Sequence, residues 1–536
     1  MTTRAEHPIR FRPMGVYDTL SGDNSSSGAC EVLQDLIPDP STPACFVCRP
    51  ANTTAIDFST WASAPGTVGP VTVMYQVNGI VYGLVGITTG TYAGKDYPFA
   101  CDASSGAFLT VSGITTNNVP TSQATTGDWI PPQMTLMSIK LVTAHIGFDG
   151  ATHFFGVFDV TTPTSPVWSS GNTSTNALPS VPSAAQVFSN RTYFVCKNVV
   201  YYTDTLALAM ANSNQSFTIG DYTPITAFAQ LPVSTTSQGI VQGLLAFKTN
   251  SVTLITGDAV TSNLSTNLLS PSVGTTASRT VVPTPEGVVF MAVDGIRVIS
   301  FAGQVSEPNK DLATPFINAL TPSRACASFN SDTYRICIQN GAVNATPYQD
   351  YWYTMKSKLW TGPHTFEYGM ACPNGNDFLL VSNNRVGKIY NSFVVQGHNG
   401  AGVGFVEDGV PLSWRLLTSP MTDLGNMYAN SLTRSTIEMA TPASGQSYNF
   451  TAQDENGTAL ARGNIAIAAN QSIWGAFIWG LGKWGASTSG LTPLTIPWDQ
   501  AVVFSRLKVL GTGASALGLR ISSLHLGYKP LKYILN

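Results

Sequence analysis

Two cysteines stand three positions apart, Cys45 and Cys48 in the stretch Cys-Phe-Val-Cys. A CxxC pair binds zinc when a second pair of ligands completes the site, and it supports redox chemistry at the start of a helix. Cys30 lies nearby, but no histidine follows at zinc-finger spacing, and the surrounding segment 37–51 holds four prolines. The pattern therefore predicts no metal or redox centre, and it leaves the role of Cys45 and Cys48 open.

Histidine and acidic residues do not form a recognisable catalytic motif. The six histidines are His7, His145, His153, His364, His398 and His525, and no two of them fit an HExxH pattern. A Gly-x-Ser-x-Gly elbow, a phosphate loop and sialidase-type Asp boxes are also absent from the sequence. Paired carboxylates depend on their separation in space, so the sequence does not test them. We therefore predict no catalytic, cofactor-binding or metal-binding residue, no cofactor, and no enzyme activity.

Seven short turn signals separate runs of apolar and β-branched residues. They are Asn78-Gly79, Asp149-Gly150, Lys197-Asn198, Thr249-Asn250, Asp294-Gly295, Ser331-Asp332 and Asn383-Asn384. These residue types tolerate left-handed backbone or bond their own backbone, so each pair indicates a β-hairpin. Successive turns are 71, 48, 52, 45, 37 and 52 residues apart. The mean is close to the repeat of about 40–50 residues that four-stranded propeller blades have.

The hairpin series predicts an all-β fold with a β-propeller of about six to seven blades over residues 66–400. A closed ring leaves only short, protected strand edges, which suits a chain with few lysines to guard them. Asp350–Gly362 reads as an outer strand pair whose Trp360 packs between blades. The alternative is a long β-sandwich array without closure.

The two flanks differ from the hairpin series. Residues 1–65 are expected to form an extended arm that packs on a platform or a neighbour, with one short helix at Ala29–Ile37. Residues 401–536 are expected to form a β-sandwich-like platform domain. Trp474, Trp479 and Trp484 stand on a Gly-rich segment and serve either another chain or a local core. The basic residues Arg506, Lys508, Arg520, Lys529 and Lys532 face solvent or an acidic partner.

Composition limits the possible partners. Only 11% of the residues are charged and the net charge is −3, compared with about 25% charged residues in average soluble domains. This balance gives no general attraction to nucleic acid or anionic membrane. No apolar run is long enough for a membrane helix, and the N-terminal residues show no signal peptide. The same composition suits a subunit of an assembly or a surface β-protein.

Three stretches in this order resemble the nozzle proteins of short-tailed bacteriophages, also called tail tubular protein B or head-to-tail joining, DNA-stabilisation proteins. The first is residues 14–51, which ends in Arg49-Pro50-Ala51. The second is residues 288–320, a hairpin with a short helix, followed by the strands of 325–339 and 350–364. The third is the closing strand pair of residues 502–531.

The resemblance implies a structural virion protein of the phage tail that is assembled in the host cytoplasm. Such nozzles form a homohexameric ring below the portal–adaptor complex, continue its DNA channel, help to retain the genome, and pass DNA at ejection without sequence-specific binding. Tail fibres or spikes dock on some of them, and no membrane is involved. The alternative is a glycan-binding or glycosidase-type propeller, such as a receptor-binding spike, with Tyr351, Trp352 and Trp360 stacking on sugar. A bacterial propeller scaffold is a third option.

Overall fold

Antiparallel strands make up nearly all of the regular structure in the computed structural model, which divides into two units. The first unit comprises Met1–Thr53, Asp350–Thr365 and Ser392–Asn536, and the second comprises Thr54–Gln349 and Phe366–Asn391. The structure describes residues 7–11, 16, 29–39, 42–123, 129–173, 176–212, 214–235, 239–257, 263–308, 312–339, 348–382, 387–394, 406–419, 430–440, 447–454, 456–466, 491–498, 506–512 and 521–530.

The second unit contains six four-stranded antiparallel sheets, each built largely from consecutive strands. The first sheet consists of β6(Val68–Val77), β7(Ile80–Ile87), β8(Lys95–Asp102) and β9(Phe108–Leu109). The second consists of β10(Gln133–Met137), β11(Lys140–Ala144), β12(Phe155–Asp159) and β13(Val167–Gly171). The third consists of β14(Ala184–Phe188), β15(Arg191–Cys196), β16(Val199–Tyr202) and β17(Ser216–Thr218). The fourth consists of β18(Ile225–Thr235), β19(Gly239–Lys248), β20(Val252–Thr256) and β21(Ser265–Ser270). The fifth consists of β22(Val282–Thr284), β23(Gly287–Ala292), β24(Gly295–Ile299) and β25(Val305–Ser306). The sixth joins β30(Tyr368–Asn374), β31(Asp377–Ser382) and β32(Lys388–Ser392) to β5(Thr53–Asp57).

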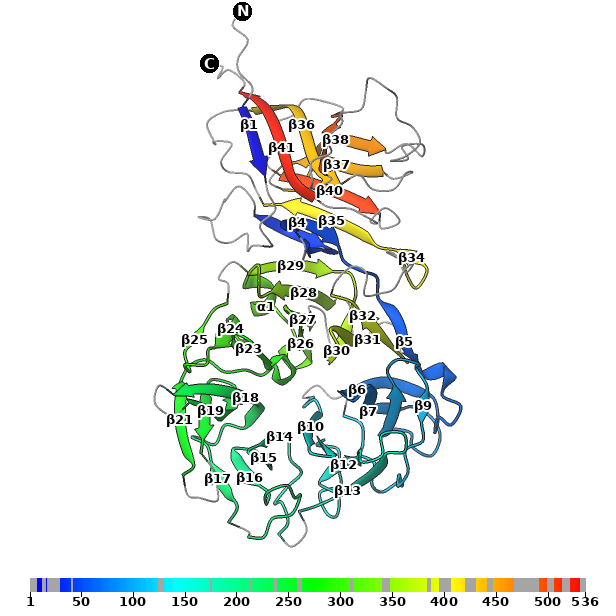
Figure 1. The fold of residues 1–536 in the computed structure, drawn as a ribbon, viewed down its shortest axis with the longest axis vertical. Helices are drawn as coiled ribbons and strands as arrows, with labels where there is room; N and C mark the ends of the chain where they lie inside the picture. Colours follow the sequence, from blue (N-terminus) through cyan, green and yellow to red (C-terminus); the bar gives the residue numbers. More distant parts are fainter. Residues whose placement is uncertain are drawn as a thin grey trace, which may run out of the picture. The chain divides into compact units, whose positions relative to one another are not determined.

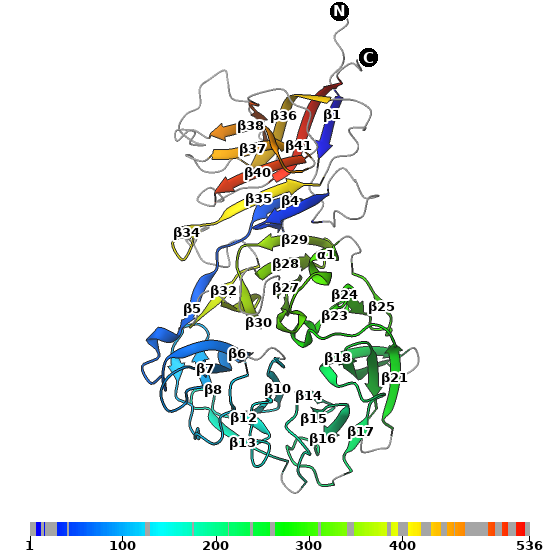
Figure 2. The same ribbon diagram turned by 180° about the vertical axis from the view of Figure 1, so that it is seen from behind.

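These sheets are the blades of a closed ring (Figures 1 and 2). The inner strands contact one another in the order β6, β10, β14, β18, β22, β26 and β30, and β30 returns to β6. β26(Cys326–Asn330), which pairs with β27(Thr333–Gln339), holds a seventh position between the fifth and sixth four-stranded sheets. The predicted all-β fold with a propeller of about six to seven blades is therefore confirmed.

The ring is closed by a strand from outside the blade series. β5 precedes the first blade in the sequence, yet it is the outer strand of the last sheet, beside β32. Directly after β5, the Phe58 ring packs edge-on against Phe99 of β8 at a centroid distance of 5.0 Å. The start and the end of the propeller are thus joined by hydrogen bonds and by a shared core.

The predicted hairpin turns occur in most blades. Asn78 and Gly79 have φ angles of 51° and 82° and join β6 to β7 as a two-residue turn. Lys197 and Ser331 also have positive φ, in the turns that precede Val199 and Thr333. Two predictions were displaced. Ala292 pairs with Gly295, so Val293-Asp294 forms that turn, and Asp149 lies in a loop of ten residues between β11 and β12. Asn383 and Asn384 lie outside the described residues.

Aromatic side chains fill the spaces between neighbouring blades. Tyr82 of β7 meets Phe158 of β12 at a centroid distance of 5.5 Å. Phe155 of β12 stacks on Phe194 of β15 at 4.7 Å, and Phe247 of β19 meets Phe290 of β23 at 5.0 Å. Because a blade can use both faces in this way, second strands such as β7, β15 and β23 are buried at every residue, as in sheets covered on both sides.

The first unit contains two larger sheets. One has the order β3(Leu36–Asp39), β4(Thr42–Cys48), β41(Ile521–Pro530), β36(Asn430–Ala440) and β39(Leu491–Ile496), with β1(His7–Phe11) also paired to β41. The other runs through β28(Tyr348–Thr354), β29(Leu359–His364), β2(Cys30–Gln34), β35(Ser413–Thr418), β40(Arg506–Thr512), β37(Ser447–Gln453) and β38(Ala459–Ala466). A separate hairpin joins β33(Val406–Glu407) to β34(Val410–Pro411).

The expectation of a helix at Ala29–Ile37 was wrong. These residues form β2 and the start of β3, with Asp35 between them at a φ of 54°. The tertiary context decides the conformation, because β2 pairs with β35 from the C-terminal part of the chain. Asp350–Gly362 does form an antiparallel pair, β28 with β29, as predicted.

Helices are short wherever the structure is described. α1(Thr314–Ile317) follows the β23–β24 hairpin, in agreement with the sequence, and three 3-10 turns are η1(Phe58–Thr60), η2(Ser278–Thr280) and η3(Pro322–Arg324). Among the described residues, none of the helices has the length and apolar character required to cross a membrane.

Candidate functional site

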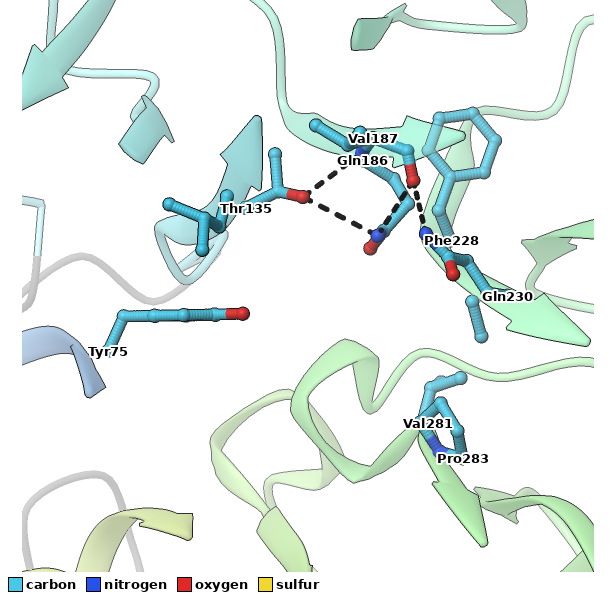
Figure 3. A pocket seen from close by; sticks show the side chains of 10 residues that line it. Tyr75, Thr135, Gln186, Val187, Phe228, Gln230, Val281 and Pro283 are labelled. Atoms are coloured by element: carbon cyan, nitrogen blue, oxygen red, sulfur yellow. Dashed lines mark hydrogen bonds between the residues drawn. The ribbon is translucent and has the colours of Figure 1, made fainter. Parts of the chain in front are cut away.

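The centre of the propeller holds a cavity of about 300 Å³ between its inner strands. Five blades contribute to its wall through β6, β10, β14, β18 and the segment that begins β22. The lining residues are Tyr75, Thr135, Leu136, Gln186, Val187, Phe228, Ala229, Gln230, Val281 and Pro283. Because the ring brings its inner strands together here, this is where residues far apart in the sequence share one concave surface (Figure 3).

Three polar side chains on this wall are linked through the backbone of one residue, Val187. The Val187 N–H donates to Thr135 Oγ1 at 3.0 Å, and Gln186 Nε2 donates to the same hydroxyl at 3.4 Å. Gln186 and Gln230 both donate to the Val187 carbonyl. Figure 3 shows this cluster beside the apolar side chains of Phe228 and Val281. The amide nitrogens are thus occupied, and no described residue donates to the two amide oxygens, which remain as acceptors.

The cavity wall carries almost no titratable group. Tyr75 is the one ionisable side chain among its ten described lining residues. Burial raises the pKa of Tyr75, and the nearby Cys372 raises it further, so the phenol stays neutral at physiological pH. General acid–base catalysis needs a group that titrates near the working pH. This wall offers hydrogen bonds and apolar contact, and it offers no such group.

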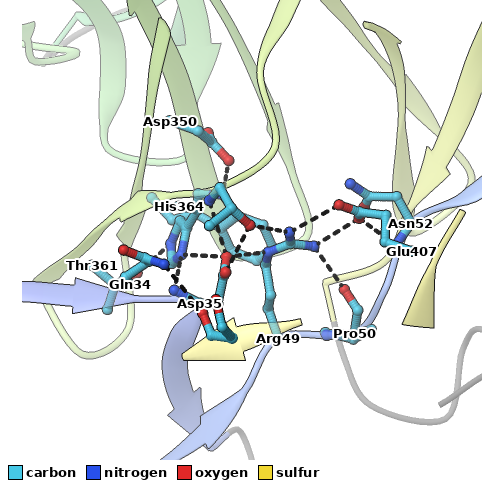
Figure 4. Close-up of polar contacts among 12 residues, drawn as sticks. Gln34, Asp35, Arg49, Pro50, Asn52, Asp350, Thr361, His364 and Glu407 are labelled. Carbon is cyan, nitrogen blue, oxygen red and sulfur yellow. Dashed lines mark hydrogen bonds and ion pairs between the residues drawn. The ribbon is translucent and has the colours of Figure 1, made fainter. Parts of the chain in front are cut away.

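Charged side chains instead form a buried network inside the first unit (Figure 4). Arg49 Nε donates to Asp35 Oδ1 at 2.6 Å, and Arg49 Nη1 donates to Glu407 Oε1 at 3.2 Å. Thr365 donates to both oxygens of Asp35, from its N–H at 3.1 Å and its hydroxyl at 2.7 Å. The Asn52 N–H donates to Glu407 at 2.9 Å. One guanidinium therefore separates the two carboxylates and connects three segments of the unit.

The burial of this network rules out a role in contacting substrate. Arg49 and Asp35 have no exposed side-chain surface, and Glu407 has 8%. Burial by itself lowers the pKa of Arg49, but the charges and hydrogen bonds of Asp35 and Glu407 outweigh it and raise that pKa. A charge this deep is tolerated only when it is paired and hydrogen-bonded. The arrangement holds the fold of the first unit together.

The described histidines are bonded within the fold. His145 accepts the Gly147 N–H on Nδ1 at 2.9 Å, so Nε2 carries the proton and donates to Asp96 at 2.8 Å. His364 accepts the Asp35 N–H on Nδ1 at 3.0 Å. His153 bonds the Ser170 hydroxyl at 2.8 Å. These three side chains therefore hold parts of the fold together, and the side chains of His7, His398 and His525 are outside the described part.

The cysteines are buried thiols. Cys45 and Cys48 lie on β4, and none of the eight cysteines forms a disulfide. Burial raises the pKa of Cys48, and the charge of Asp35 raises it further. No group of three or more cysteine, histidine or acidic residues in the described segments is placed to hold a metal ion.

The aromatic residues suggested for sugar stacking are not available as a surface. Tyr351, Trp352 and Trp360 are 4%, 2% and 1% exposed, so their ring faces are covered by other side chains. Trp352 also donates from Nε1 to Asp350 at 2.8 Å. That part of the glycan hypothesis was wrong. Trp474, Trp479 and Trp484 lie outside the described residues.

The C-terminal basic residues have different environments. Arg506 Nη2 lies 2.9 Å from Glu31 Oε1 in an ion pair. Lys508 is half-buried on β40, beside a groove of the β37–β38–β40 sheet face. Arg520, Lys532 and the side chain of Lys529 lie outside the described part of the structure.

The residues of the central cavity and of the Arg49 network were missed by sequence reasoning. Thr135, Gln186 and Gln230 stand on three different inner strands. Their contact arises from the packing of the blades, so no motif with a fixed spacing in the sequence reveals it. Arg49 did carry a signal, because a lone arginine directly after the apolar run Cys-Phe-Val-Cys is placed where burial is expected.

Comparison with known proteins identifies no family. No family model matches the chain, and no curated protein matches it. Among solved structures, an exo-β-1,3-galactanase of Phanerochaete chrysosporium aligns with a TM-score of 0.25 and 7% identity over 89% of this chain and 100% of its own. A chain from the structure of BBS1N in complex with ARL6DN aligns with a TM-score of 0.38 and 10% identity over 65% of this chain and 98% of its own. The WD40 propeller domain of Doa1 aligns with a TM-score of 0.35 and 9% identity over 60% of this chain and 93% of its own. At these scores the likeness supports no statement about function. The protein is a β-propeller with a second, β-rich unit.

Proposed function

We propose that the chain is a structural virion protein, the ring-forming tail nozzle of a short-tailed phage. In this role it continues the portal–adaptor DNA channel, helps to retain the genome, and passes DNA at ejection. The proposal includes a homohexamer, docking on the adaptor–portal complex, and a place in the phage tail. Tail fibres or spikes are possible further partners.

The uncharged central cavity is the observation that carries the non-enzymatic part of this proposal. Propellers bind ligands and substrates where their inner strands meet, and here the described wall has no carboxylate, histidine, lysine or thiol. The buried carboxylates of the first unit, Asp35 and Glu407, are neutralised by Arg49. Neither region has an acid and a base that can reach a bound substrate.

The nozzle part of the proposal rests on the resemblance and on the organisation of the chain. The segments that carry the resemblance at the two ends of the sequence meet in the first unit, where β4 pairs with β41. A ring of identical subunits needs two different surfaces that close on each other. With only 11% charged residues, such surfaces would rely on polar and apolar contact.

Mixing the purified chain with adaptor–portal complexes tests this proposal. We expect electron microscopy to show one added ring with six copies of the chain, and virion images to contain the same density at the tail. A tail that lacks this chain, or a complex that does not bind it, would contradict the proposal.

The glycan-binding alternative is favoured by one feature, the two free amide acceptors of Gln186 and Gln230 in an uncharged cavity. Neutral sugars present many hydroxyl donors that suit such acceptors. Saturable binding of the isolated chain on a glycan array, lost in Gln186→Leu and retained in the exposed-surface variant Thr54→Ala, would favour this function over the nozzle.

A further inference from the structure

Two arginines share one tryptophan ring in the second unit. The guanidinium carbon of Arg279 lies 4.4 Å from the ring centroid of Trp129, and that of Arg324 lies 5.1 Å from it. Arg279 Nη2 also donates to the Arg324 carbonyl at 3.0 Å. The negative face of an indole attracts one cation well. A second guanidinium on the same indole repels the first, and the attraction of the ring does not offset this repulsion.

The three residues belong to opposite sides of the ring of blades. Trp129 precedes β10 by four residues, Arg279 precedes β22 by three, and Arg324 precedes β26 by two. Inner strands of a propeller run in one direction, because the blades repeat around a central axis. All three residues therefore lie at the end of the channel where the inner strands begin. In the ring order, β10 stands across from β22 and β26, and the Trp129 ring lies against the guanidinium groups of Arg279 and Arg324.

Positive charge at this end is not balanced at Arg279. No described carboxylate pairs with Arg279, and its buried Nε has no hydrogen-bond partner among the described residues. Burial lowers the pKa of Arg279 and outweighs Cys326 and Tyr348, which raise that pKa, while the charge of Arg324 lowers it further. Trp129 and Arg324 are buried, whereas Arg279 keeps part of its surface exposed.

We propose that the Trp129–Arg279–Arg324 cluster is a binding site for one small oxyanion of the phosphate class. Guanidinium groups bind phosphate through parallel N–H bonds of matched geometry. A phosphate that is mostly dianionic therefore suits the guanidinium of Arg279, which no described carboxylate pairs. Because one indole ring contacts both guanidinium groups, we expect the site to take a single small anion and not a polymer. This inference is independent of the nozzle proposal.

Phosphorus NMR of inorganic phosphate with the full chain tests the site. The titration uses a chloride buffer at constant ionic strength, and we expect saturable broadening of the phosphate line. Arg279→Gln should weaken the apparent affinity by about tenfold or more. The matched control is Arg297→Gln, whose arginine already pairs with Asp294 and Glu307, and it should stay within about twofold of wild type.

Circular dichroism decides whether each variant is folded. If Arg279→Gln does not fold, Arg279→Lys keeps the charge without the planar fork, and it should still bind phosphate more weakly than wild type. Absence of saturable broadening, or equal affinity in the folded Arg279 variant, would overturn the proposal. A short oligonucleotide that displaces phosphate at lower concentration than free phosphate itself would also overturn it, because the site would then serve a polymer.

Discussion

Arg49 donates from Nε to Asp35 Oδ1 across 2.6 Å, and neither side chain has exposed surface. Asp35 sits in the turn between β2 and β3, and Arg49 directly follows β4. Glu407, from β33, lies on the other side of the guanidinium at 3.2 Å. The N-terminal strands are therefore fixed to a later segment of the first unit by one cation, in addition to their backbone pairing.

Replacing Arg49 by methionine should destabilise the protein strongly. The substitution keeps apolar volume but leaves two buried carboxylates without their cation, which costs about 3–5 kcal/mol in comparable sites. Denaturant unfolding followed by circular dichroism measures the loss. The control is Arg297→Met, which removes an exposed pair worth about 0–1 kcal/mol. Equal losses in the two variants would show that the Arg49 network does not stabilise the unit.

Gly156 on β12 is required by the ring of Trp168 on β13. A Cβ at position 156 would lie 2.1 Å from Trp168 Cη2, and the indole is only 1% exposed. Gly156→Ala should therefore cost about 1–3 kcal/mol through overpacking. Phenylalanine at position 168 lacks the clashing atoms. The double variant Gly156→Ala with Trp168→Phe should be less destabilised than the sum of the two single variants, and additive losses would contradict the clash.

The blade series was predictable from sequence because each hairpin carries its own turn chemistry. The irregular spacing has a structural reason. Asn78-Gly79 and Ser331-Asp332 join the first and second strands of their blades, whereas Lys197-Asn198 and Thr249-Asn250 join the second and third. When one turn signal joins the first two strands of its blade and the next joins the second and third strands, the sequence distance between the two signals becomes longer, as in the first interval. The reverse change makes the distance before Ser331-Asp332 shorter. A local signal identifies a hairpin and does not say which pair of the blade it joins.

Non-local contacts explain what the sequence did not predict. β5 closes the ring on β32 from more than 300 residues away, and nothing in its five residues specifies that partner. The pairing of β2 with β35 is equally remote, so the residues of β2 alone do not reveal a strand. The cavity residues Gln186 and Gln230 meet only when the neighbouring strands β14 and β18 pack side by side. Short sequence patterns can indicate a strand or a turn, but pairing with residues far away in the sequence decides which strands lie next to each other.

Asp102 should make stability depend on acid pH. Its Oδ1 accepts the Ser104 hydroxyl at 2.6 Å and the Ser105 N–H at 2.8 Å. These bonds, that of the Ser104 hydroxyl first, lower the pKa of Asp102 to about 2, compared with about 3.9 in an unfolded chain. A lowered folded pKa stabilises the fold above the unfolded value, and this contribution is lost as the pH falls toward about 2.

The measurement for Asp102 is the melting temperature of Asp102→Asn against wild type between neutral and acid pH. We expect the variant to melt lower at pH values above about 4 and the difference to vanish near pH 2. Ser104→Ala removes the hydrogen bond that lowers the pKa of Asp102 most. This variant should therefore also show a smaller change of melting temperature with pH than wild type. A difference that is constant with pH would mean that the carboxylate charge has no role in this turn.

The thiols should be unreactive in the folded protein. All eight cysteines are buried without a disulfide, and burial raises the pKa of Cys101 and Cys372 to about 12. Because the thiolate is the reactive form, Ellman's reagent should modify the native chain very slowly and all eight thiols after unfolding. Rapid reaction of two thiols, lost in Cys45→Ser with Cys48→Ser, would instead identify the CxxC as an exposed redox pair.

Ring closure should depend on Ile56, the one fully buried residue of β5. Its side chain belongs to the same apolar cluster as Phe58 and Phe99, so Ile56→Ala removes packing where the first and last blades join. We expect a loss of about 2–5 kcal/mol in the free energy of unfolding. Thr54→Ala on the same strand is the matched control, because Thr54 is exposed and should change stability by about 0.5 kcal/mol or less. Limited proteolysis adds a second readout, since an opened ring exposes the edge of β32. If Ile56→Ala and Thr54→Ala behave alike in both measurements, β5 is an accessory strand and the ring is held by its inner strands alone.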